Sequence, residues 1–214
     1  MLEGVRSPGR TRVGDPHRRA QSRGLIRALS RACLRRTGGR FRRGYRERVA
    51  LASGESISFR LLGRRDSAVL ERIFARLSPK ARYQRFFAHK SALSGSDLRT
   101  LTRCDGKDQI AIVAFDQRTS EPVGVARFVR DRIDPVSAEV AVAVIDAHHR
   151  KGIGRLLLKR IMEAARHRGI REVKFLVLAD NAAMTALAYQ LGGRRQPPSA
   201  EGDGFSTLVV PLDS

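Results

Sequence analysis

The chain has 214 residues, of which 42% are hydrophobic, so it can form the core of one ordinary domain and is not disordered throughout. Its uncharged apolar runs are too short to cross a bilayer, and its two cysteines, Cys33 and Cys104, cannot form a disulfide framework; we expect free thiols in a reducing cytoplasm. The net charge of +21 favours an anionic partner, while the low aromatic content argues against a stacking surface for single-stranded nucleic acid.

The first 50 residues carry more than half of the excess charge, with fifteen arginines, no lysine and only three acidic residues. The composition changes near Ala50, so we predict a mostly disordered arm over residues 1–50 and one domain over residues 51–214. Within residues 24–36, apolar residues recur at every fourth position with arginines on the opposite side. This pattern predicts a short basic amphipathic helix in the arm.

Several interpretations of the arm remain open. Its charge suits nucleic acid, an anionic membrane surface or a targeting presequence. The alternatives are a solvated tail and an upstream stretch wrongly included in the coding sequence. The arm therefore does not decide the function.

From residue 55 the apolar residues follow regular periods. Alternation over residues 55–61 predicts a half-buried strand, and the apolar stripe that follows a capping Asp66 predicts a helix to Leu77. Two short helices are expected over residues 78–87 and 96–101. Strands are expected over 109–115, 122–129, 138–145, 173–179 and 206–212, and helices over 152–167 and 181–191. This order predicts an α/β (α+β) fold, a mixed sheet covered by helices on both faces.

Residues 139–154 are the most informative part of the chain. They contain a strand, a short basic loop and the turn Gly152-Ile153-Gly154 at the start of the long helix. Glycines let the backbone approach a ligand closely, and free N–H groups at a helix start point toward an anion. With the charges of Arg150, Lys151 and Arg155, this segment suits a pyrophosphate; the alternative is a tight strand-to-helix turn.

Within the strand, Glu139 shares one face with Ala141, Ala143 and Ile145, whereas three valines lie on the other face. We expect the valine face to pack against helices. The small residues leave room beside the carboxylate; the alternative is an exposed acid paired with an arginine. No residues have metal-ligand spacing, and the adjacent His148 and His149 are expected to face solvent.

These motifs resemble the GNAT acetyltransferase superfamily. Arg150-Lys151-Gly152-Ile153-Gly154, after an Ala-Glu-Val-Ala-Val-Ala-Val strand, is similar to its acyl-coenzyme A motif, and the segment 177–192 is similar to a second block. A third block, residues 77–87, resembles the GNAT domain of bacterial protein lysine acetyltransferases of the Pat type. The resemblance covers roughly residues 57–194 and implies a mixed, mostly antiparallel sheet flanked by helices on both faces.

The resemblance implies acetyl-coenzyme A (acetyl-CoA) as the co-substrate. The loop before the long helix would hold its pyrophosphate, and the preceding strand would offer backbone groups to the pantetheine arm and the thioester. The implied contacts are Val142, Ala143, Val144, Arg150, Lys151, Gly152, Ile153, Gly154, Arg155 and Asn181. His149 stands where the family usually has Gln or Arg, and Ala188 stands at the family's frequent catalytic Tyr.

Glu139 lies where Pat-type enzymes place their general base, and either water or Tyr189 would protonate the leaving thiolate. The resemblance favours a protein lysine as acceptor, and a small amine remains open. Arg76, Lys80, Arg82 and Arg85 would favour an acidic acceptor surface or would form a solvated helix face. Two other hypotheses remain: a catalytically silent acyl-CoA-binding module, and a nucleic-acid-binding protein that uses the arm.

Overall fold

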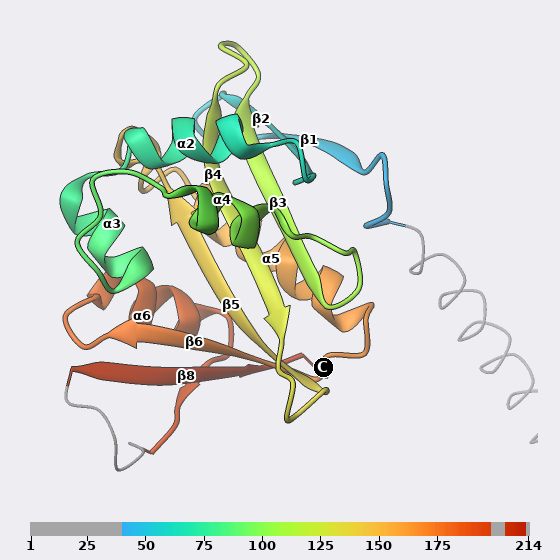
Figure 1. Ribbon diagram of the computed structural model, residues 1–214, viewed down its shortest axis with the longest axis vertical. Coiled ribbons are helices and arrows are strands. Elements are labelled where there is room, and N and C mark those ends of the chain that lie inside the picture. Colours follow the sequence, from blue (N-terminus) through green and yellow to red (C-terminus); the bar gives the residue numbers. More distant parts are fainter. Residues whose placement is uncertain (1–39, 198–203, 213–214) are drawn as a thin grey trace, which may run out of the picture. The chain divides into compact units, whose positions relative to one another are not determined.

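The computed structural model describes residues 40–197 and 204–212 (Figure 1). The helix that we predict over residues 24–36 lies outside these described residues, as does Cys33. A compact unit begins at Phe41. Every strand and helix predicted from residue 55 onward is present, with ends within two residues of the predicted ones.

The described residues form one sheet of eight strands in the order β1-β2-β3-β4-β5-β6-β8-β7. Neighbouring strands are antiparallel except β5 and β6, which are parallel. The mixed, mostly antiparallel sheet is therefore confirmed. The strands are β1 Arg46–Ala50, β2 Ser56–Leu61, β3 Gln109–Asp116, β4 Pro122–Arg130, β5 Ser137–Val144, β6 Glu172–Leu178, β7 Arg194–Arg195 and β8 Phe205–Pro211.

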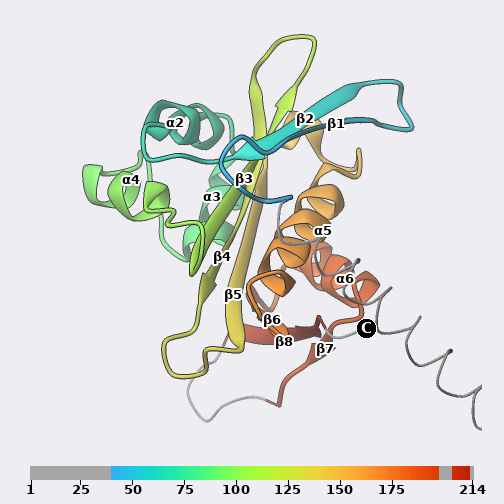
Figure 2. The same cartoon turned by 90° about the vertical axis from the view of Figure 1, so that its right-hand side faces the viewer.

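Helices cover both faces of the sheet, as predicted. Figure 2 shows α2, α3 and α4 on one face and α5 and α6 on the other. The helices are α2 Ser67–Ala75, α3 Pro79–Phe86, α4 Gly95–Thr102, α5 Ile153–Arg166 and α6 Ala182–Gln190, and a 3-10 turn, η1, spans Asp146–His148.

The long helix α5 covers β3, β4 and β5 with a continuous apolar stripe. Its buried apolar residues recur at helical spacing: Ile153, Leu157, Leu158, Ile161, Ala164 and Ala165. At Gly124 of β4, a Cβ atom would lie 3.1 Å from both Leu157 and Val144. Val144 therefore points toward α5, and alternation places Val140 and Val142 on the same face, which confirms that the valine face packs against a helix.

The structure begins earlier than the charge pattern indicates. Phe41 is 1% exposed and packs against the rings of Tyr45 and His167, with centroid distances of 4.8 and 5.8 Å. Strand β1 pairs with β2 along its whole length. The domain boundary that we predict near Ala50 is therefore placed too late, because the arginine-rich composition extends into residues that belong to the sheet.

Strand β1 is also joined to α5. Glu47 Oε1 lies 2.6 Å from Arg160 Nη2, and the Arg160 guanidinium lies 4.0 Å from the centre of the Phe59 ring. The Tyr45 hydroxyl donates to the other oxygen of Glu47 at 2.7 Å. One arginine of α5 thus fastens the edge strand through a charge pair and an aromatic face.

Asp66 does not cap α2 with its side chain, although it occupies the N-cap position. Its carboxylate instead forms a two-pronged ion pair with Arg60, at 2.7 and 2.9 Å, and accepts the Gly63 N–H. The predicted helix is correct, and the predicted capping bond is wrong because a guanidinium binds both oxygens of the carboxylate.

Replacing Phe41 by alanine is expected to destabilise the fold by about 3 kcal/mol, because it leaves a cavity in the core. For a chain of this size the melting temperature should fall by roughly 9 °C, measured by calorimetry. The control is Ile133→Ala, at a side chain that is 94% exposed, which should melt like the natural chain. Equal melting of both variants would show that Phe41 is not part of the core.

Candidate functional site

The loop between β5 and α5 has the backbone shape of an anion-binding turn. Arg150 and Gly152 have φ angles of 63° and 81°, so the chain turns sharply before the helix. Within the described residues, no side chain caps the first turn of α5. Nor do the N–H groups of Arg150, Lys151 and Gly152 donate to any acceptor in that part of the chain. The predicted pyrophosphate loop therefore presents free N–H groups at a helix start.

The charged side chains of this loop are not equivalent. Arg150 and Arg155 are exposed, whereas Lys151 forms a 2.7 Å ion pair with Glu55, just before β2. That pair lowers the pKa of Glu55. Burial, with the nearby Lys151 charge, lowers the pKa of His148, so its imidazole is neutral at pH 7. The positive charge open to a ligand comes chiefly from the two exposed arginines.

Strands β5 and β6 separate halfway along β5. Their parallel pairing consists of three residue pairs and ends at Glu139 and Lys174, while β5 continues to pair with β4 as far as Val144. Figure 1 shows the two strands diverging beyond this point. The edge of β5 that faces β6 is therefore unpaired beyond residue 139, and this stretch is here called the β5–β6 gap.

Alternation decides which backbone groups face the β5–β6 gap. The Ile145 N–H donates to the carbonyl of Val123 in the adjacent strand β4. Every second residue before Ile145, including Ala143, therefore directs its N–H and C=O at β4. The backbone groups of Val142 and Val144 point the other way, into the gap. Of the three backbone contacts predicted for the pantetheine arm, the two valines are therefore available, and the groups of Ala143 are engaged in the sheet.

His149 closes part of the gap. Its Nε2 lies 2.7 Å from the Val144 carbonyl, so a proton on Nε2 joins the loop to the last residue of β5. Two further hydrogen bonds hold the loop on the opposite side of the sheet. The Ser78 N–H and hydroxyl donate to the two oxygens of Asp146, each at 2.8 Å, which ties the start of α3 to η1.

The predicted residues on α6 have different roles. The side-chain oxygen of Asn181 accepts the Met184 N–H at 3.1 Å and caps the helix. Its amide nitrogen has no hydrogen-bond acceptor within the part of the chain that the structure describes. Tyr189 is 48% exposed on the same helix. The predicted contact of Asn181 with the co-substrate thus coexists with a capping function.

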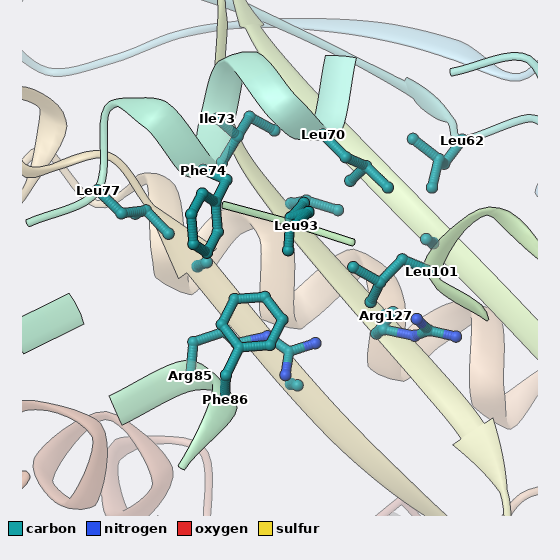
Figure 3. Close-up of a pocket in the computed structure, with 14 residues that line it drawn as sticks. Leu62, Leu70, Ile73, Phe74, Leu77, Arg85, Phe86, Leu93, Leu101 and Arg127 are labelled. Carbon is teal, nitrogen blue, oxygen red and sulfur yellow. The ribbon is translucent and has the colours of Figure 1, made fainter. Parts of the chain in front are cut away.

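On the other face of β5, Ala141 and Ala143 line a small cavity of about 30 Å³ under α2, α3 and α4. Glu139 is exposed and shares this face of β5 by alternation. The walls of this cavity are mostly apolar, and Figure 3 shows the Arg85 and Arg127 side chains among the residues that line the cavity. The cavity lies beside the two alanines of this face, and Glu139 is not among the residues that line it.

The two arginines affect each other. Burial, with repulsion from Arg127, lowers the pKa of Arg85 to about 10, and burial also lowers the pKa of Arg127. Both remain charged at pH 7, and the negative charge of Glu139 acts favourably on both. Arg127 was missed by the sequence analysis. Its signal is a single charge inside the buried strand pattern Val-Ala-Arg-Phe-Val.

Other chemistries lack a site in the described residues. No group of three or more His, Cys, Asp or Glu side chains there could hold a metal ion. None of the described helices has the length and apolar character needed to cross a membrane. Cys104 is a free thiol whose pKa is raised by burial, which suits a packing residue better than a nucleophile.

Proteins of known family are similar to this chain in sequence. The profile of the acetyltransferase (GNAT) family matches residues 76–192, just over half of the chain. An acetyltransferase of Pseudomonas aeruginosa is 28% identical over 152 residues, which are 69% of this chain and 81% of that protein. The acetyltransferase Pat of Mycolicibacterium smegmatis is 32% identical over 95 residues, which are 44% of this chain and 28% of that protein.

Solved structures agree with the family match. The GNAT domain of S. lividans PAT superposes with a TM-score of 0.72 at 28% identity, covering 78% of this chain and 96% of that domain. A putative acetyltransferase of Salmonella typhimurium, solved with its cofactor acetyl-CoA, shares the fold with a TM-score of 0.59 at 21% identity, over 73% of this chain and 94% of that one. Acetyl-CoA is the co-substrate of this family. The chain belongs to the GNAT family of acetyltransferases.

Proposed function

We propose that this chain transfers the acetyl group of acetyl-CoA to a primary amine by direct attack in a ternary complex, with Glu139 as the general base. The observation that carries the proposal is the β5–β6 gap, which opens beside the free N–H groups at the start of α5. The Pat relatives favour a protein lysine as the acceptor, and the proposed setting is the reducing cytoplasm.

The residues present fit acetyl-CoA as a substrate. The N–H groups of residues 150–155 suit the pyrophosphate, and the exposed Arg150 and Arg155 supply positive charge for it. The free backbone groups of Val142 and the free N–H of Val144 suit the amides of the pantetheine arm, since His149 occupies the Val144 carbonyl. Without a ligand, the backbone groups at the uncapped start of α5 and along the unpaired edge of β5 bind only water. A polar ligand can replace this water at both places.

The attacking amine must be neutral. A lysine-type ammonium has a pKa near 10.4, so freeing its lone pair at pH 7 costs roughly 4.6 kcal/mol. In the proposed step Glu139 accepts this proton, directly or through a water, as the nitrogen bonds to the acetyl carbon. The carboxylate is exposed on the cavity face, where an acceptor can approach it.

As the nitrogen attacks, the thioester oxygen becomes negative, and a free N–H group of β5, from Val142 or Val144, is placed to donate to it. The carbon–sulfur bond then breaks, the nitrogen releases its second proton to water, and the thiolate takes a proton from water or from the Tyr189 hydroxyl. The assignment of Glu139 follows from the family resemblance and from its exposure. The family's catalytic Tyr aligns with Ala188, so Tyr189 is proposed because its exposed hydroxyl lies one residue further along α6.

Changing Glu139 to glutamine is expected to lower kcat for amine acetylation at pH 7 by about 10²- to 10⁴-fold, because the amide cannot accept the proton. The affinity for acetyl-CoA, measured by calorimetry, should not change. The control is Glu71→Gln, at an exposed residue of α2, which should retain full activity. An unchanged kcat for Glu139→Gln contradicts the assigned base. Acetyl-CoA binding without turnover of any amine by the natural chain would favour the silent module.

Changing Gly152 to alanine is expected to weaken acetyl-CoA binding about tenfold, because its φ of 81° suits glycine and a side chain there disturbs the free N–H groups. Gly169 offers a matched control at the other end of α5, with a φ of 78° and equally open surroundings. Both variants should lose similar thermal stability, and only Gly152→Ala should lose affinity. An equal affinity for both would place the pyrophosphate elsewhere.

A further inference from the structure

The cavity on the face of β5 that Glu139 shares is lined by two arginines and by no acidic residue. Arg127 projects from β4, with its backbone opposite Ala141, into a space covered by apolar side chains of α2 and α4 (Figure 3). It is 8% exposed, and its Nε is buried without a hydrogen-bond partner among the described residues. Its one hydrogen bond runs from Nη2 to Gln109 Oε1 at 3.3 Å.

Arg85 is the second charge, and it differs from its neighbours. Arg82 donates to the carbonyls of Phe74, Ala75 and Ser91, so its charge is used within the fold. Arg85 has no hydrogen bond or ion pair within the described residues and lies over the Phe86 ring at 5.1 Å.

A buried cation that lacks a hydrogen-bonded anion is unfavourable unless a ligand supplies one. Glu139 attracts both guanidinium groups but forms an ion pair with neither. Two cations beside one carboxylate leave an unbalanced positive charge at the place where the acceptor approaches.

We propose that the acceptor amine carries a carboxylate next to the amine, and that Arg85 and Arg127 bind this carboxylate while the amine faces Glu139. This inference rests on the proposed function and narrows its acceptor class. Guanidinium groups match the planar, two-oxygen shape of a carboxylate, and a cavity of about 30 Å³ has room for a few polar atoms. The opposite charges of the site complement a zwitterionic acceptor.

The carboxylate has two possible sources. It belongs to a free amino acid, or to an acidic side chain that flanks the target lysine of a protein. Both offer the same group to the same arginines, and a substrate panel separates them. The panel contains free amino acids with their α-amides, and lysine peptides flanked by glutamate or by glutamine.

The full-length chain should acetylate the carboxylate-bearing member of one of these pairs with a kcat/KM about 10- to 100-fold above its neutral partner, as expected for charge-assisted hydrogen bonds. In Arg85→Gln and Arg127→Gln this preference should fall toward one, while the KM for acetyl-CoA stays unchanged. Lys80→Gln removes an exposed charge from the same helix as Arg85 and should keep the preference.

Amino acids preferred over their amides identify the first source, and glutamate-flanked peptides preferred over glutamine-flanked ones identify the second. Equal kcat/KM within every pair overturns the inference and leaves the proposed function standing. If no amine is acetylated, the proposed function fails, and the thermal shift by the same compounds decides the inference. A shift by the carboxylates that is lost in both arginine variants supports it, and the absence of such a shift overturns it.

Discussion

The separation of β5 from β6 is the constraint on which the rest of this site depends. A paired strand has no backbone groups to offer a ligand, whereas β5 pairs with β6 only as far as Glu139 and leaves the backbone groups of Val142 and the N–H of Val144 free beyond it. Beyond this point α5 covers the valine face of β5, and β6 remains paired with β8 on its other edge. The unpaired edge of β5 thus keeps backbone groups that need a polar partner, which is water or a ligand.

Charge is distributed over this scaffold in an ordered way. Several of the arginines and lysines bind a carboxylate or a backbone carbonyl within the fold. Arg160 pairs with Glu47, and Arg82 donates to carbonyls. Among the described cations without an ion pair, Arg150 and Arg155 lie at the loop before α5, and Arg85 and Arg127 line the cavity under α2, α3 and α4. The net charge alone therefore says little about partners, and the position of each unpaired cation says much more.

The sequence predicts much of this structure because most elements follow local rules. Alternation and helical spacing predict the strands and helices from residue 55 onward, and the glycine turn predicts the loop. The sequence does not predict the residue at which the pairing of β5 with β6 ends. Pairing between distant strands depends on tertiary packing, which local sequence patterns do not contain. The burial of Phe41 is not predicted, because arginines surround it in the sequence. Asp66 binds the Arg60 guanidinium instead of capping its own helix. Arg127 is detectable only as one charge in an apolar strand.

The ion pair between Lys151 and Glu55 links the loop before α5 to the turn between β1 and β2. A phosphate that attracts Lys151 must compete with Glu55, so occupation of the loop loosens one attachment of the edge hairpin. Coupling of this kind is reciprocal: whatever holds the hairpin away from the loop strengthens phosphate binding by the same factor. The edge hairpin of β1 and β2 is thereby coupled to the α5 terminus, although neither strand touches the loop through its own hydrogen-bonded ladder.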